Sequence, residues 1–228
     1  MKKQVAVIGI GRLGFSLATT LFNLGHEVLA IDTVVKNIES IASKITHAVE
    51  ADATSESVLQ ELGIRNFDIA IVTMSEIENS VLTTLLLKKM GVPYVIARAD
   101  NELHGSILER LGADKVVYPE REMGVMVAHV LSLGNIIDFI DYIPVSAGYG
   151  AVKFVAPASF IGSSLSSLGF GAKGEWKVAV LLIQRKSDVI ITPSDTEKIV
   201  SEDILVVSGN WDSLEQLFGR LQSNKAIS

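Results

Sequence analysis

A short glycine-rich stretch near the start of the chain has the residue types and spacing of a phosphate-binding turn. It reads GIGRLG, from Gly9 to Gly14, and directly follows the apolar run from Val5 to Ile8. In the G-x-G-x-x-G pattern the first glycine allows a tight turn, the second lets the backbone approach a phosphate, and the third lets the following helix pack close to the strand. A helix that begins here presents free N–H groups and the positive end of its dipole to an anion. The pattern therefore predicts a nucleotide site, and a glycine-rich turn without a ligand is the alternative.

Two charged residues near this turn indicate which nucleotides fit. Asp32 ends the next apolar run, eighteen residues after Gly14, where a carboxylate commonly binds the hydroxyls of an adenosine ribose. A carboxylate there disfavours NADP but accepts NAD, ATP and ADP alike, and its alternative role is to cap the next helix. Arg12 falls in the first turn of the predicted helix, where the dipole disfavours a cation unless an anion compensates it. We interpret Arg12 as a ligand for the terminal phosphate of a mononucleotide.

The sequence contains no evident catalytic constellation to accompany this turn. A nicotinamide-dependent oxidoreductase needs a His, Lys or Tyr at the hydride centre and a domain that holds the substrate. We interpret the four histidines as structural residues with satisfied hydrogen bonds: His26, His47, His104 and His129. We therefore predict a nucleotide sensor rather than an enzyme, with a small NAD-dependent oxidoreductase as the alternative.

Strand and helix patterns alternate six times through the first 130 or so residues. Apolar runs typical of buried parallel strands cover 5–8, 28–31, 48–49, 69–73, 94–97 and 116–118. Helical spacing covers 13–24, 35–45, 55–62, 81–90, 103–111 and 120–132. The alternation predicts an α/β fold, a Rossmann-like doubly wound parallel sheet with the glycine turn after its first strand.

From Gly134 onward, strand and helix patterns no longer alternate regularly. Residues 135–143 predict a short connecting helix or strand that ends at Pro144, and four β-rich segments follow over 152–155, 178–184, 189–192 and 204–207. A final helix is predicted over 213–221. We expect a nucleotide-binding domain over 1–133, a crossover over 134–143, and a small α+β module over 144–228.

The composition narrows the function classes. The net charge is −6 and no basic block occurs, which argues against nucleic acid as a partner. The absence of cysteine excludes disulfides and cysteine-based metal sites. No apolar run approaches the roughly 20 residues that a membrane span needs, and a strand is predicted within a few residues of Met1, so we expect a soluble cytoplasmic protein.

Several longer stretches together resemble the RCK proteins, which are the cytosolic nucleotide-binding subunits of Ktr/Trk-type potassium uptake systems. The stretches are VIGIGRLG, AIDTV, EADAT, IRNFDIAIVTM, TTLLLKKMGV and ARADNELHGSILERLGADKVVYPEREMG. The resemblance covers nearly the whole chain and implies an RCK module at the C-terminus. It further implies that homodimers assemble into a ring, usually an octamer, which docks on a membrane-embedded potassium channel subunit and controls its gate.

The resemblance also assigns roles to individual residues. Adenine nucleotide, ATP or ADP, is expected at the site, and NAD or NADH is the alternative ligand. The nucleotide-binding residues that the match implies are Gly9, Gly11, Arg12, Leu13, Gly14, Asp32, Asp52, Ala53, Thr54, Arg98 and Glu120. Glu120 is further implied to reach a divalent or monovalent cation at the dimer interface, its alternative being an N-terminal helix charge.

The C-terminal stretch SLGFGAKGEW departs from the family members that bind cyclic di-AMP between two subunits. Gly169 and Gly171 stand where those members commonly carry charged residues, although Lys173 and Pro193 remain. We therefore do not predict a cyclic di-AMP site.

Overall fold

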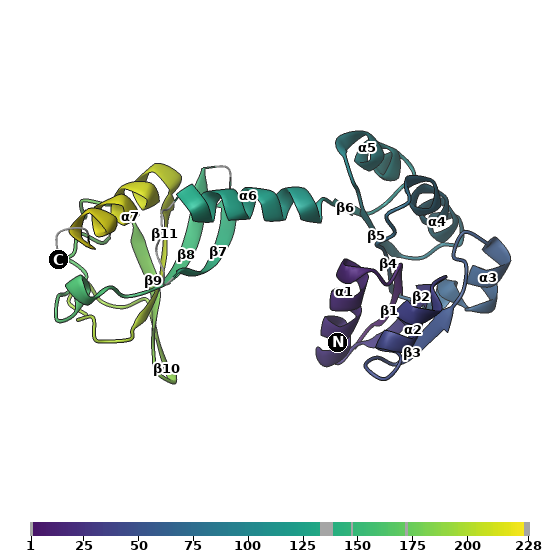
Figure 1. Cartoon of the computed structure of the whole chain (residues 1–228), viewed down its shortest axis with the longest axis horizontal. Helices are drawn as coiled ribbons and strands as arrows, with labels where there is room; N and C mark the ends of the chain where they lie inside the picture. Colours follow the sequence, from purple (N-terminus) through teal and green to yellow (C-terminus); the bar gives the residue numbers. More distant parts are fainter. Residues whose placement is uncertain (1, 133–138, 147, 172, 226–228) are drawn as a thin grey trace. The chain divides into compact units, whose positions relative to one another are not determined.

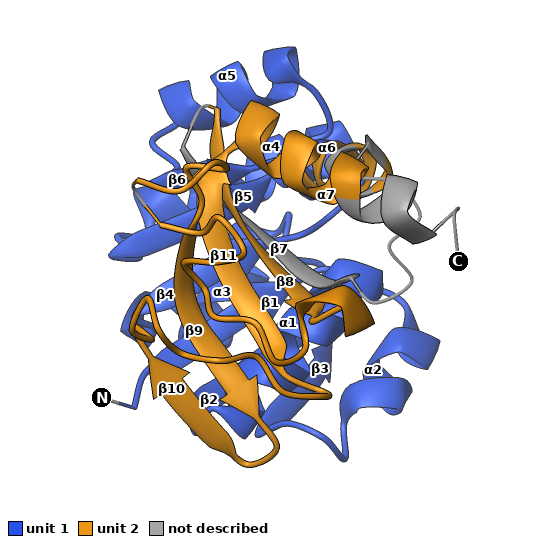
Figure 2. Ribbon diagram, turned by 90° about the vertical axis from the view of Figure 1, so that its left-hand side faces the viewer, with its two compact units in different colours: residues 1–121 blue, residues 122–228 orange. Residues whose placement is uncertain are grey.

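The computed structural model describes residues 2–132, 139–146, 148–171 and 173–225 (Figure 1). These residues divide into two compact units, 1–121 and 122–228 (Figure 2). Helix α6 (Pro119–Ser132) spans that division. The predicted domain limits at residues 133 and 143 stay predictions, because residues 133–138 lie outside the described part of the chain.

The first unit contains a six-stranded parallel sheet. Its strands are β1 (Gln4–Ile8), β2 (Glu27–Asp32), β3 (His47–Glu50), β4 (Ile69–Val72), β5 (Tyr94–Arg98) and β6 (Lys115–Val117), in the order β3-β2-β1-β4-β5-β6. This is the strand order of the doubly wound fold, so the predicted Rossmann-like architecture is confirmed. The order reverses between β1 and β4, and ligands of such sheets bind at the carboxyl ends of the strands near that point.

Helices cover both faces of this sheet. Val5 and Val7 of β1 pack in a core with α1 (Arg12–Asn23) and α2 (Val35–Ile41). Ala6 and Ile8, which alternate with them, pack in a second core with α3 (Glu56–Glu61), α4 (Ile77–Lys89) and α5 (Glu102–Arg110). The continuous apolar run of β1 reflects burial on both faces.

Two predicted helices of this unit, α2 and α4, differ from the structure by more than one residue at one end. Helix α2 ends at Ile41 rather than Ile45, because the chain turns there and the N–H of Lys44 donates to the carbonyl of Ile41. Helix α4 begins at Ile77 rather than Val81, so its first turn follows β4 closely. The early start of α4 brings polar residues of its first turn to the carboxyl edge of the sheet.

The second unit contains a five-stranded antiparallel sheet and a helix. The strands are β7 (Phe139–Ser146), β8 (Tyr149–Val155), β9 (Ala179–Arg185), β10 (Asp188–Ile191) and β11 (Ile204–Asn210), in the order β10-β9-β11-β8-β7. Helix α7 (Trp211–Lys225) packs on this sheet through Leu214, Leu217 and Phe218. The rings of Phe154 and Phe218 meet edge to face with centroids 5.0 Å apart. The predicted α+β module is confirmed.

Pro144 does not end its segment as predicted. Strand β7 continues to Ser146, although its pairing with β8 is irregular between Pro144 and Ser146. β7 is the edge strand of its sheet, where a residue without an N–H group is tolerated. Residues 135–138 of the predicted connecting element lie outside the described residues.

None of the helices in the described parts of the chain combines the length and the apolar character that crossing a membrane requires.

Candidate functional site

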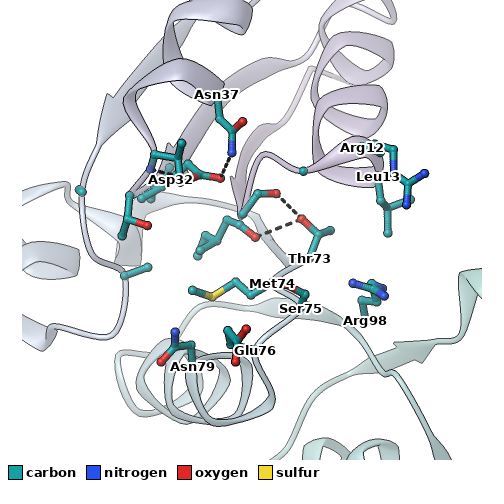
Figure 3. A pocket seen from close by; sticks show the side chains of 18 of the residues that line it. Arg12, Leu13, Asp32, Asn37, Thr73, Met74, Ser75, Glu76, Asn79 and Arg98 are labelled. Carbon is teal, nitrogen blue, oxygen red and sulfur yellow. Dashed lines mark hydrogen bonds between the residues drawn. The ribbon is translucent and has the colours of Figure 1, made fainter.

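A cavity of about 500 Å³ opens at the carboxyl edge of the parallel sheet. Its lining comes from the β1–α1 turn, from the β2–α2 connection, from Ala51 and Ala53 after β3, from the residues that follow β4, and from Arg98 and Glu120. Figure 3 shows side chains from these separate segments arranged around it, with Asp32 and Asn37 on one side and Arg12 and Arg98 on another. The cavity therefore lies where a doubly wound sheet binds its ligand.

The glycine turn has the geometry that its pattern predicts. Gly9 has φ +90°, a conformation that glycine adopts readily. Gly11 is the N-cap of α1, so the free N–H groups of the first helical turn begin directly after it. A Cβ atom on Gly14 would overlap the carbonyl oxygen of Gly9 and lie 2.7 Å from Oγ1 of Thr73. Gly14 thus allows the close approach of α1 to the turn and does not itself line the cavity.

Asp32 connects the glycine turn to the start of α2. Its carboxylate accepts hydrogen bonds from the N–H of Ile10 (2.5 Å), the N–H of Val34 (2.7 Å) and Nδ2 of Asn37 (3.2 Å). The N-cap of α2 is Val34, so Asp32 is not that cap, although it supports the turn before the helix. A carboxylate has about four acceptor positions, and these three donors leave one of them for a ribose hydroxyl.

Arg98 and Glu120 form the charged end of the cavity. Nη2 of Arg98 lies 2.8 Å from Oε1 of Glu120 and 2.8 Å from Oδ1 of Asp100, and Nε lies 3.3 Å from Oε2 of Glu120. The Arg98 side chain is largely buried, with 16% of its surface exposed. Partial burial opposes ionisation of Glu120, but its own backbone N–H, the hydrogen bond from Arg98 and the charges of Arg98 and Arg12 outweigh that effect and lower its pKa. Glu120, whose side chain is 67% exposed, is therefore an anion paired with Arg98.

Comparison with known proteins identifies the family. The TrkA-N domain matches residues 5–119, and the TrkA-C domain matches residues 150–222. The Ktr system potassium uptake protein C of Bacillus subtilis (strain 168) is 39% identical over 226 residues, which cover 99% of this chain and 100% of that protein. The Ktr system potassium uptake protein A of the same organism is 40% identical over 215 residues, which cover 94% of this chain and 95% of that protein. The chain belongs to the Ktr/Trk family of potassium uptake proteins.

A solved structure has the same fold as this Ktr/Trk-family chain. The RCK domain of GsuK matches with a TM-score of 0.50 and 19% identity, over 96% of this chain and 47% of that one. The resemblance inferred from the sequence, a regulatory RCK subunit of a Ktr/Trk system, is confirmed by the family and by its near full-length relatives.

The structure of the Ktr/Trk-family chain brings most of the predicted site residues to one cavity. Those that line it are Gly9, Gly11, Arg12, Leu13, Asp32, Ala53, Arg98 and Glu120. Asp52 and Thr54 lie beside the lining, where Oδ1 of Asp52 accepts hydrogen bonds from the hydroxyl (2.7 Å) and the N–H (2.9 Å) of Thr54. These hydrogen bonds lower the pKa of Asp52 and fix the turn that presents Ala53. The part that each residue plays in binding stays a prediction.

The residues after β4 line the cavity and were not among the predicted ones. Thr73 is buried, and its hydroxyl lies within hydrogen-bond distance of the carbonyls of Ile8 and Gly9. It therefore ties the end of β4 to the glycine turn. Beyond it lie Met74, Ser75, Glu76 and Asn79. The sequence does contain a signal for them, because they follow the strand next to β1 at the point where the strand order reverses.

One predicted structural histidine is not fully satisfied. His104 has 2% of its surface exposed, and its Nε2 has no hydrogen-bond partner among the described residues. Its environment lowers its pKa, through burial first and through the charge of Arg98, against an opposing effect of Asp100. The same described residues contain no group of three or more His, Cys, Asp or Glu that could hold a metal ion by itself.

Proposed function

We propose that this chain is an adenine-nucleotide-sensing subunit that controls a membrane-embedded potassium channel subunit. In this proposal it binds ATP or ADP in the 500 Å³ cavity, forms homodimers that build a ring of eight, and acts in the cytoplasm, where its channel partner holds it at the membrane. The near full-length similarity to Ktr system potassium uptake proteins supports the potassium system as its setting. The observation that carries the choice of ligand is the convergence of Asp32, the glycine turn and two arginines on one cavity.

The adenosine half of the ligand is proposed to lie between Asp32 and Ala53. The remaining acceptor position of the Asp32 carboxylate suits a ribose hydroxyl, and a 2′-phosphate in that place would meet a negative charge. Val34 has 50% of its surface exposed and lines the cavity together with Ala51 and Met74. These apolar side chains suit the faces of an adenine ring.

The phosphates are proposed to lie over the glycine turn and to extend toward Arg12 and Arg98. Arg12 is the first residue of α1, where its positive charge opposes the helix dipole, and a polyphosphate would compensate both. A cation would be held there by Glu120 together with phosphate oxygens. Mg²⁺ is commonly bound in this manner, by one or two carboxylates and by phosphates.

Gating in this proposal requires no chemical reaction. ATP carries one more phosphate than ADP to the arginines, so the two nucleotides stabilise different arrangements of the charged end. A ligand shifts a conformational equilibrium only through its different affinities for the two states. Coupling of about 1–3 kcal/mol per site is usual for allosteric proteins, and several sites in a ring add together.

The proposed ligand is tested by calorimetric titration of the purified protein with ATP, ADP, NAD and NADH, each with and without Mg²⁺. We expect micromolar or tighter binding of ATP and ADP, different affinities for the two, and no hydrolysis. Tight binding of NADH alone would overturn the choice of ligand and would favour redox sensing. Turnover of NADH with a substrate would favour the oxidoreductase alternative.

Asp32→Ala is expected to weaken the binding of every adenosine ligand about tenfold or more. The change removes the ribose partner and also the acceptor for the N–H groups of Ile10 and Val34, and hydrogen bonds to a charged group contribute about 1.5–3 kcal/mol each. The measurement is the same titration with ATP, ADP and NAD. Unchanged affinity for all three would contradict a ribose at Asp32.

Arg12→Ala is expected to remove most of the difference between ATP and ADP. The guanidinium is proposed to contact the terminal phosphate, so ATP should lose about tenfold in affinity and ADP much less. Arg12→Lys, which keeps the charge, is the matched control and should keep part of the preference. Equal losses for ATP and ADP would count against this role.

A further inference from the structure

The side chain of His104 accepts a hydrogen bond from a backbone N–H group. His104 is the third residue of α5, and its ring Nδ1 accepts the backbone N–H of Asp100 at 3.3 Å. Its own N–H donates to Oδ1 of Asn101, the N-cap of the helix, at 2.9 Å. An Nδ1 that accepts places the ring proton of a neutral imidazole on Nε2. The histidine therefore serves the preceding loop as an acceptor.

The loop that His104 holds leads directly to the charged end of the cavity. Asp100 follows β5 by two residues, and its Oδ1 lies 2.8 Å from Nη2 of Arg98. Arg98 in turn contacts both carboxylate oxygens of Glu120. Arg98 and Glu120 line the cavity, whereas Asp100 and His104 are not among its lining residues. Asp100 thus links the buried His104 ring, through its backbone N–H, to the Arg98 guanidinium, through its carboxylate.

If packing were its only role, a histidine would be less stabilising at this position than an apolar side chain of similar size. Its Nε2 is buried without a partner in the described part of the chain, and an unsatisfied buried polar atom is destabilising. A leucine would occupy a similar space without that atom. The feature that leucine lacks is the Nδ1 acceptor for Asp100.

We propose that His104 is a positioning residue for the phosphate end of the nucleotide site. By accepting the N–H of Asp100 it fixes the Asp100 carboxylate, which orients the Arg98 guanidinium toward Glu120 and the ligand phosphates. The inference rests on the proposed function, because it requires a phosphate-bearing ligand at Arg98.

Two substitutions of His104 separate positioning from packing. The amide of His104→Asn keeps a polar acceptor near the place of Nδ1, whereas His104→Leu keeps the volume and removes the acceptor. ATP affinity is measured by calorimetric titration, and the melting temperature of each variant without ligand is measured in parallel. We expect His104→Leu to bind ATP about fivefold more weakly, the usual effect of one hydrogen bond. It should melt close to the wild type, because losing the acceptor for Asp100 and removing the unsatisfied Nε2 have opposite effects on stability. We expect His104→Asn to bind ATP within about twofold of the wild type.

The route through Asp100 is tested in the Asp100→Ala background. There the carboxylate that orients Arg98 is absent, so His104→Leu should cause no further loss of ATP affinity. Additive losses would overturn the route, and wild-type affinity in His104→Leu would overturn the inference. Equal losses in the Asn and Leu variants would also overturn it, since the loss of affinity would then not depend on the acceptor. A wild-type protein that binds no nucleotide would instead overturn the proposed function, and the inference with it.

Discussion

Replacing Gly14 by alanine is expected to disrupt the nucleotide-binding turn and to abolish nucleotide binding. The added Cβ would overlap the carbonyl oxygen of Gly9 and lie 2.7 Å from Oγ1 of Thr73. The first obstacle is backbone, which cannot turn away as a flexible side chain can. Helix α1 would have to move away from β1, and the core around Ala18 would open with it. Overpacking of this kind typically costs about 1–3 kcal/mol, and we expect the upper end here.

The measurement combines scanning calorimetry with ATP titration, and Gly11→Ala is the matched control. Gly11 has φ −73° and ψ −167°, and a Cβ built on it meets no atom of the structure within 4 Å. The control should therefore melt close to the wild type. It should nevertheless bind ATP at least about tenfold more weakly, because Gly11 lines the cavity where the backbone approaches the phosphates. A Gly14→Ala protein with wild-type melting and binding would contradict the close packing.

The fold of the first unit could be predicted because its elements are defined by local patterns. A parallel strand buried on both faces is a continuous apolar run, and β1 differs from its predicted limits by one residue. The limits of α2 and α4 could not be read in the same way, since helix ends depend on turns and tertiary contacts that periodicity does not encode. The strand through Pro144 depends on its place at a sheet edge, which is a property of the assembled sheet.

The candidate site could be predicted only as far as it is local in sequence. The glycine turn and Asp32 belong to one β-α-β unit, whose geometry fixes the spacing between them. Thr73 directly follows β4 and lies 64 residues after Gly9 in the sequence, so its contact with the turn becomes visible only when β4 lies beside β1. The unpaired Nε2 of His104 is a property of the packed interior, and sequence alone suggested a satisfied histidine.

Asp203→Ala is expected to destabilise the second unit by about 2–4 kcal/mol, because it removes charge-assisted hydrogen bonds and leaves a buried N–H unsatisfied. Asp203 is fully buried, and its two carboxylate oxygens each lie 2.9 Å from a guanidinium nitrogen of Arg185. It also accepts the N–H of Val200 at 2.9 Å. Its removal takes away two of the partners of the Arg185 guanidinium, which is 30% exposed and keeps Glu197 and the carbonyl of Lys198, and it leaves the N–H of Val200 without its acceptor. The free energy of unfolding in urea measures the loss. Asp188→Ala, which removes an exposed carboxylate of β10, is the control and should change it by about 0.5 kcal/mol at most.

The same pair makes the effect of this substitution depend on pH. Burial raises the pKa of Asp203, but the hydrogen bonds and charge of Arg185 and the N–H of Val200 outweigh it, so the pKa is lower in the folded state than in the unfolded state. The carboxylate therefore stabilises the fold fully above its unfolded pKa of about 3.9, and this contribution is lost as the pH falls below that value toward the folded pKa.

The pH dependence of the wild type alone would not reveal the contribution of Asp203, because four other groups also have lowered pKa values: Glu27, Asp52, Asp114 and Glu120. Those four groups are common to the wild type and the variant, and their effects cancel in the difference between the two. We expect that difference to stay constant from pH 7 to about pH 5 and to shrink below about pH 4, and a difference that grew in acid would contradict the assignment.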